Sequence, residues 1–175
     1  MRSHILETAR RLTLEHGLVP SLNAVAEAAN VSKGGLMHHF PTRSSLVVGL
    51  ARQALDEVDV AMSAAAARGT AARTWLQLSL PEGDERALMR AMASSFQPTD
   101  DDFTLLLTDS ASAIARWESL IAAEVGDATQ AHVIRLIGDA LVGNALVGLD
   151  SPNEDVEELL GFVTAGRVAR SSNGR

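Results

Sequence analysis

The residues of this chain best suited to bind a polyanion lie in one short run, residues 31–40, which contains the only lysine among 175 residues. Lys33 is followed there by two glycines, and the run ends in two histidines and a phenylalanine. A lysine in the first turn of a helix faces the positive end of the helix dipole, and a glycine inside a helix costs about 1 kcal/mol relative to alanine. An anion lying against this helix would offset both costs, so we predict a binding site here.

The chemistry that this run predicts is recognition of double-stranded DNA. Ser32 is suited to cap a helix about 10 Å long, which is enough to lie across the major groove. Lys33 has the reach to contact guanine or a phosphate, and His38 to contact a base edge or a phosphate. Gly34 and Gly35 carry no side chain, so they would let the backbone approach DNA closely.

Three residues at or near other predicted helix starts, Ser21, Asn23 and Arg43, are expected to position the DNA backbone or to touch flanking bases. Simpler roles remain open for two members of the run. Lys33 has the alternative of a solvated surface lysine, and His39 is expected to pack or cap within its domain in preference to reading a base.

The elements that must position these residues are helices, because apolar residues recur at helical spacing and no segment alternates as a strand does. Ser21, Ser32 and Thr42 are suited to cap helices, and Asn30 tolerates the left-handed backbone of a tight turn. The sequence predicts an all-α protein of about nine helices whose first three form a helix-turn-helix domain. The predicted helices cover about residues 3–16, 22–29, 33–40, 42 to beyond 62, 70 to beyond 80, 88–96, 99–125, 128–149, and a last segment that ends near 168.

Composition narrows the class of protein further. The net charge is −7, yet residues 1–48 carry five basic and three acidic side chains, so the excess of negative charge lies in the remainder. There is no cysteine, which excludes disulfides and thiolate metal sites. No secretory signal or membrane-spanning segment is recognised, and we expect a cytoplasmic protein without metal or cofactor.

The segment 128–149 is apolar on nearly every face, and a helix of that kind must be covered on all sides. Its glycines, Gly138, Gly143 and Gly148, would permit close approach of other helices. We therefore predict a homodimer formed through the last two helices, about residues 128–168. The alternative is a central core helix in a monomer.

The N-terminal region resembles the DNA-binding domain of TetR-family (tetracycline-repressor-like) transcriptional regulators over about residues 3–50. The similarity rests on residues 5–9, Gly17, residues 25–36, the His39-Phe40 pair and residues 43–46. It differs at Asn30, where the family usually has glycine, and at Met37, where a tyrosine hydroxyl commonly touches a phosphate. Arg43 stands where lysine is common.

This resemblance implies a homodimeric repressor that leaves a palindromic operator when a small molecule enters the C-terminal domain. The implied domains are a helix-turn-helix domain over 1–46, a helical ligand-binding and dimerisation domain over 47–170, and a flexible tail over 171–175. The predicted DNA-binding residues are Ser21, Asn23, Ser32, Lys33, Gly34, Gly35, Met37, His38 and Arg43.

An effector site is predicted from large apolar side chains with two polar anchors. The candidate residues are Trp75, Met89, Met92, Phe96, Phe103, Asp109, Trp117 and Asn144. Such residues at helical spacing also form ordinary core, and Asn144 is equally suited to bond across a dimer interface.

Two other functions are weighed against a ligand-released repressor. An enzyme is not expected, because the chain lacks a His-Glu-x-x-His motif, a phosphate-binding loop and a cysteine nucleophile. A DNA-binding adaptor regulated by a protein partner, with no ligand, remains the alternative. A filled C-terminal core would favour the adaptor, and an enclosed cavity with convergent polar groups would favour the repressor.

Overall fold

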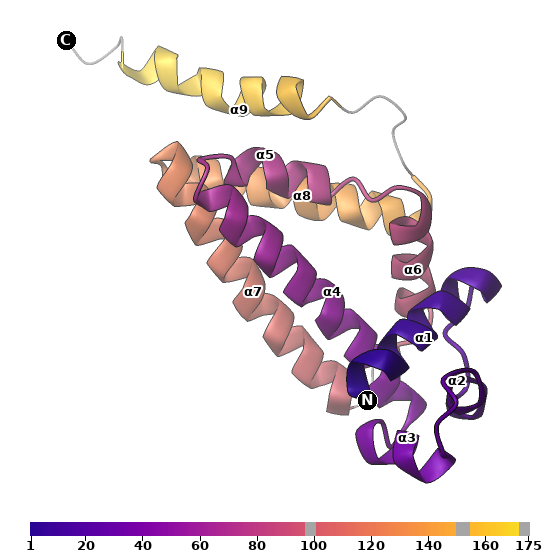
Figure 1. The fold of residues 1–175 in the computed structure, drawn as a ribbon. Coiled ribbons are helices and arrows are strands. Elements are labelled where there is room, and N and C mark those ends of the chain that lie inside the picture. Colours follow the sequence, from indigo (N-terminus) through magenta and orange to yellow (C-terminus); the bar gives the residue numbers. More distant parts are fainter. Residues whose placement is uncertain (97–100, 150–154, 172–175) are drawn as a thin grey trace. The chain divides into compact units, whose positions relative to one another are not determined.

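The computed structural model describes residues 1–96, 101–149 and 155–171, and within these ranges it contains nine α-helices and no strand (Figure 1). The predicted all-α fold is therefore confirmed. The helices are α1 (Arg2–His16), α2 (Leu22–Ala28), α3 (Lys33–His39), α4 (Arg43–Ala66), α5 (Ala71–Leu78), α6 (Gly83–Ala93), α7 (Asp101–Val125), α8 (Ala128–Val147) and α9 (Val156–Ser171). None of the helices in the described ranges is long and apolar enough to cross a membrane.

The chain forms two compact units, which are described separately. The first unit contains Met1–Glu57 and Glu82–Ser112, and the second contains Val58–Pro81 and Ala113–Arg175. Helices α4 and α7 contribute residues to both. The functional domains inferred over 1–46 and 47–170 are a different division and stay a prediction. Of the predicted tail, Ser171 ends α9 and residues 172–175 lie outside the described residues.

Local side-chain chemistry sets the ends of the first three helices. The Ser21 hydroxyl accepts a hydrogen bond from Ala24 N at 3.2 Å, and the Ser32 hydroxyl accepts one from Gly35 N at 3.0 Å. Each bond satisfies one of the amides that the first turn of a helix leaves unpaired. Asn30 adopts a φ of 53°, so the left-handed turn predicted between α2 and α3 is confirmed.

The start of α4 is fixed by a reciprocal pair of bonds. Ser45 N donates to Thr42 Oγ1 at 2.9 Å, and Thr42 N donates to Ser45 Oγ at 3.1 Å. This arrangement is a capping box with serine in the place usually taken by Glu or Gln. It fixes the first residue of α4, Arg43, directly after the turn that follows α3.

The core of the first unit places α3 against the helices that support it. α1 packs on α2 and α6, and α2 packs on α3. Leu36 and Phe40 are buried, at 0% and 1% exposed, so the predicted inward face of the third helix is confirmed. A Cβ at Gly49 would lie 2.7 Å from Phe40 Cε1 and 3.1 Å from Leu6 Cδ2. Glycine at this position therefore lets α4 approach both side chains.

The second unit is built around α8, which packs on α5 and α9. A Cβ at Gly138 would lie 2.2 Å from Trp75 Nε1 and 2.6 Å from Ser79 Oγ, so any larger residue would force these side chains of α5 and its end to shift. The Trp75 indole N–H donates to the Arg135 carbonyl at 3.3 Å. The close approach predicted for the glycines of this helix is thus observed at Gly138.

Two carboxylates of the second unit are stabilised in their charged form. Asp59 Oδ1 accepts hydrogen bonds from Arg116 Nη2 and Trp117 Nε1, each at 2.9 Å, and these bonds lower the pKa of Asp59 below its ordinary value of 3.8. His132 and Arg135 lower the pKa of Glu118 in the same way, and His132 has the larger effect. These contacts join α7 to α4 and to α8.

Candidate nucleic-acid interface

The outer side of α3 presents four of the predicted DNA-binding residues. Lys33, Gly34, Met37 and His38 are exposed, while Leu36 between them is fully buried. Their spacing of three and four residues places them along one side of the helix, because a helical turn has 3.6 residues. The side that carries Leu36 attaches α3 to the core, which leaves the opposite side accessible to a large ligand.

The two neighbouring glycines of α3 are explained differently by the structure. A Cβ at Gly35 would lie 3.1 Å from Ser32 Oγ, so this glycine makes room for the helix cap. A Cβ at Gly34 would meet nothing within 4 Å. Because alanine would favour the helix at that position, the fold itself gives no reason for glycine there. The close approach of DNA predicted from the sequence would provide such a reason.

The start of α2 holds two more predicted residues, Ser21 and Asn23, both exposed. The Ser21 hydroxyl accepts the bond that caps α2, and its proton remains available for an oxygen acceptor. The same holds for Ser32 at the start of α3. The structure therefore brings two serine caps and the exposed side of α3 into one packed pair of helices, α2 and α3.

Residues 5–50 match the sequence profile of the family described as bacterial regulatory proteins, tetR family. This match identifies the N-terminal region of the chain as a TetR-family DNA-binding domain. The match supports a DNA-binding transcriptional regulator of this family. The match covers the helices α1 to α3 and the beginning of α4, which are the elements that carry the geometry above. A search of curated proteins found no significant match to the chain.

Two contacts made by α1 beside α2 and α3 were not predicted from the sequence. The Arg2 guanidinium lies 5.1 Å from the centre of the Phe40 ring, which places a second cation beside the end of α3. His4 Nε2 donates to the Ala29 carbonyl at 3.0 Å and so ties α1 to the end of α2. Both contacts join residues that are more than 20 positions apart, and no local pattern marks them.

Arg43, which stands where lysine is common in the TetR family, makes contacts within the protein in this structure. Its Nη2 donates to the Val19 carbonyl at 2.7 Å and to Ser95 Oγ at 3.3 Å. All three residues belong to the first unit. Contact of Arg43 with a DNA phosphate stays a prediction, and the guanidinium retains other N–H groups for it.

The residues predicted for an effector site are divided between the two units. Phe96 and Phe103 of the first unit contact each other with ring centres 4.9 Å apart, and Trp75 and Trp117 of the second do so at 5.7 Å. Met89 and Met92 belong to the first unit and Asn144 to the second, and each is at least partly buried.

The polar anchor predicted in the first unit, Asp109, is exposed and already paired. Its Oδ2 accepts from Arg52 Nε at 2.8 Å and from Arg52 Nη2 at 2.7 Å. A ligand that used Asp109 would have to displace this arginine or share the carboxylate with it. The effector site as a whole stays a prediction.

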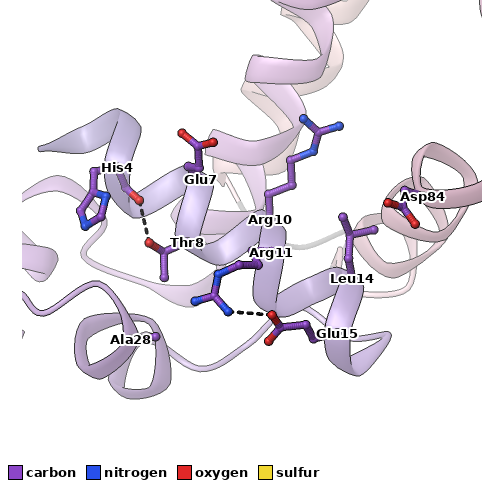
Figure 2. A pocket seen from close by; sticks show the side chains of 9 residues that line it. All are labelled: His4, Glu7, Thr8, Arg10, Arg11, Leu14, Glu15, Ala28 and Asp84. Carbon is purple, nitrogen blue, oxygen red and sulfur yellow. Dashed lines mark hydrogen bonds and ion pairs between the residues drawn. The ribbon is translucent and has the colours of Figure 1, made fainter.

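A pocket of about 760 Å³ lies in the first unit beside α1 (Figure 2). Arg10 and Arg11 extend from α1 in opposite directions, and Arg11 Nη1 is bonded to Glu15 Oε1 at 2.7 Å (Figure 2). None of the predicted effector residues contributes to the wall. The lining consists of His4, Glu7, Thr8, Arg10, Arg11, Leu14, Glu15, Ala28 and Asp84.

This pocket gives little selection for ligand charge, because its two arginines are offset by three carboxylates. Thr8 Oγ1 donates its proton to the His4 carbonyl at 2.9 Å, so this proton is not available to a ligand. Within the part of the chain that the structure describes, no group of three or more His, Asp or Glu side chains is placed to hold a metal ion.

Proposed function

We propose that this TetR-family regulator is a homodimeric repressor that binds a palindromic operator and leaves it when a small molecule binds its helical C-terminal region. The observation that carries the dimer is an exposed apolar stripe on α8. Its members are Val133, Leu136, Ala140, Gly143 and Val147, which follow one another at intervals of three and four residues. Val133, Leu136 and Val147 are 40%, 46% and 70% exposed.

The opposite side of α8 is covered within the chain. Ala131, Ile134, Gly138, Leu141 and Ala145 are buried there, beneath α5 and α9. The helix thus has two apolar sides, and its own chain covers one of them. A stripe of this spacing fits the same stripe on an antiparallel copy, and the small residues Ala140 and Gly143 permit a close crossing.

Helix α9 adds to the case for a second copy. Phe162 on this helix is 85% exposed, which is unusual for so large an apolar side chain. α8 and α9 pack on each other, and Phe162 is a further exposed apolar side chain on this pair of helices. We propose that these two helices form the dimer interface, over about residues 128–168.

On DNA, the exposed side of α3 is proposed to enter the major groove. Lys33 is assigned to guanine or phosphate, His38 to a base edge or phosphate, and Met37 to an apolar contact in place of the tyrosine hydroxyl of the family. The DNA backbone is assigned to Ser21, Asn23 and Ser32, whose side chains and adjacent helix N-termini would contact phosphates. A two-fold dimer presents two such helices, so the operator has two-fold symmetry as well.

Selection of bound duplexes from a randomised DNA pool tests the dimer and its operator together. The expected product is a palindrome whose half-sites are centred about one helical turn apart, or a multiple of it. Asymmetric single sites, or no enrichment over a non-specific pool, would contradict the proposal.

The selected duplex then serves to test effector release. A compound library is screened for molecules that dissociate the protein from this duplex. The salt concentration is held constant, because contacts with phosphates make the affinity depend on salt. Release by a small molecule supports the repressor with an effector. Failure of every compound, together with release by a protein partner, would favour the adaptor instead.

A further inference from the structure

Arg43 stands at the centre of a chain of hydrogen bonds that joins the end of α6 to the turn between α1 and α2. Ser95 follows α6 and donates its hydroxyl proton to the Ala91 carbonyl at 2.7 Å. The same oxygen accepts from Arg43 Nη2 at 3.3 Å, and Nη2 also donates to the Val19 carbonyl at 2.7 Å. These donor and acceptor roles are compatible, because Nη2 carries two protons and Ser95 Oγ can accept one hydrogen bond while it donates another.

Both ends of this chain are anchored in packed structure. Val19 and Ala91 are each 3% exposed, so their backbone carbonyls do not move freely. Arg43 itself is exposed and is the first residue of α4. It lies two residues after Pro41, in the turn that follows α3. A side chain at the edge of the DNA-binding domain is thereby attached to two fixed points that are distant in the sequence.

We propose that Arg43 is a positioning residue that holds the end of α6 to the DNA-binding domain, so that the Ser95 hydroxyl sets the operator affinity from outside that domain. This inference rests on the proposed function. The Nη2 edge of the guanidinium is used within the protein, while Nε and Nη1 remain for a phosphate. One residue then both fixes the α1–α2 turn and contacts DNA.

Arginine suits this double role in a way that lysine does not. The planar guanidinium offers five N–H donors in a fixed fork, whereas an ammonium is a compact charge with three donors on one atom. An Arg43→Lys variant therefore keeps the positive charge for a phosphate and loses the geometry that bridges Val19 and Ser95. This separates the two roles of the residue.

The chain offers a matched control for Ser95. Ser94, its neighbour, also donates its hydroxyl proton to the Ala91 carbonyl, at 3.0 Å, and makes no bond to Arg43. Ser95→Ala and Ser94→Ala thus each remove one hydroxyl that bonds to Ala91. Only the first removes an acceptor of Arg43.

The first measurement is amide hydrogen exchange of the full-length protein without DNA, which does not depend on the proposed function. Ser95→Ala is expected to raise exchange about threefold in the α1–α2 turn, residues 17–21, because loss of one acceptor loosens the guanidinium there. Ser94→Ala is expected to leave this segment at the wild-type rate. Equal exchange in wild type and both variants would overturn the proposal.

The second measurement is affinity for the duplex that the wild-type protein selects. Ser95→Ala is expected to weaken binding about threefold without changing the salt dependence, since no charge is lost. In the Arg43→Lys background the same substitution is expected to have no further effect. A full Ser95→Ala effect in that background would show that the hydroxyl acts without Arg43 and would overturn the proposal. If no duplex is selected while exchange responds as expected, the proposed function fails and the Arg43 link stands.

Discussion

Two exposed helix faces of this protein differ in chemistry, although each is the uncovered side of a helix packed into its own unit. The outer side of α3 carries Lys33, Gly34, Met37 and His38, a mixture of cation, imidazole, thioether and bare backbone. The stripe on the outer side of α8 consists of apolar residues and a glycine, including Leu136 at 46% exposed. The first suits a hydrated polyanion and the second a dry apolar partner.

The comparison shows that exposure alone does not identify a function. An exposed polar face is the default for a surface helix, and α3 stands out because it combines the only lysine with a glycine that packing does not require. An exposed apolar face is not the default, so α8 stands out by its hydrophobicity alone. The two faces should therefore respond to different substitutions, each without affecting the other.

The largest effect is expected from a charge placed on the α8 face. Leu136→Asp would bury an unpaired carboxylate in the proposed dimer interface, at a cost of about 3 kcal/mol or more. Sedimentation or light scattering should report a monomer at concentrations where the wild type is a dimer. Operator affinity should fall as well, because a monomer holds one half-site.

A matched control for this variant is Leu107→Asp in the first unit. Leu107 is 54% exposed, comparable to Leu136, and lies outside the apolar stripe of α8. It is expected to leave the oligomeric state unchanged. A dimer that survives Leu136→Asp would remove the basis for the proposed interface.

The next effect is expected on the α3 face. Lys33→Ala should weaken operator binding by about 1–3 kcal/mol, because a base or phosphate contact is lost while the dimer is preserved. A low-salt gel shift measures the affinity, and size-exclusion chromatography verifies the dimer. Arg68→Ala removes one positive charge from the second unit and should leave the affinity as it was. Unchanged binding by Lys33→Ala would make Lys33 an ordinary surface lysine.

The sequence was sufficient to predict the features that depend on nearby residues. The caps at Ser21 and Ser32, the left-handed turn at Asn30 and the inward face of α3 each involve residues within a few positions of one another. Helix patterns record this kind of interaction directly. The apolar character of α8 was equally visible, because it is a property of one segment.

Contacts between distant segments were not predictable. Arg43 and Ser95 are 52 positions apart, and Arg52 and Asp109 are 57 apart. Either arginine has many possible carbonyl and carboxylate partners until the helices are packed, and its residue type does not select among them. For the same reason the sequence does not show that Asp109, the predicted ligand anchor, pairs with Arg52.

A smaller effect is expected from the glycine that packing does not explain. Gly34→Ala should raise the stability of the free protein by up to about 1 kcal/mol, since the added methyl meets nothing and favours the helix. Operator binding should nevertheless weaken, by about tenfold, if the backbone of α3 lies against DNA. Thermal unfolding and gel shift on the same preparations measure the two quantities.

Gly143 on the α8 face is the matched position, because a Cβ there also meets nothing within 4 Å. Gly143→Ala should stabilise the helix in the same way, but its main effect on binding should be weaker self-association. A Gly34→Ala variant that binds DNA as well as wild type would mean that this glycine has no role in close approach.

The smallest expected effect is on the pH dependence of stability, and it distinguishes the second unit from the first. The carboxylates whose pKa values are lowered among the described residues, Asp59 and Glu118, belong to the unit that contains α8. Because the folded state lowers the pKa of Asp59 below 3.8, its contribution to stability is present above about pH 4 and is lost as the pH falls through the lowered value. The side chain is 39% exposed, so this contribution is less than about 1 kcal/mol.

Fluorescence allows this loss to be assigned to one unit. Both tryptophans of the chain, Trp75 and Trp117, lie in the second unit, and Trp117 is itself a donor to Asp59. Asp59→Asn keeps an acceptor for the indole and removes the charge. The stability difference between wild type and this variant, followed by tryptophan emission, should therefore be largest at neutral pH and shrink as the pH falls below 3.8. A difference that stays constant down to pH 2.5 would show that it arises from packing and not from the charge of Asp59.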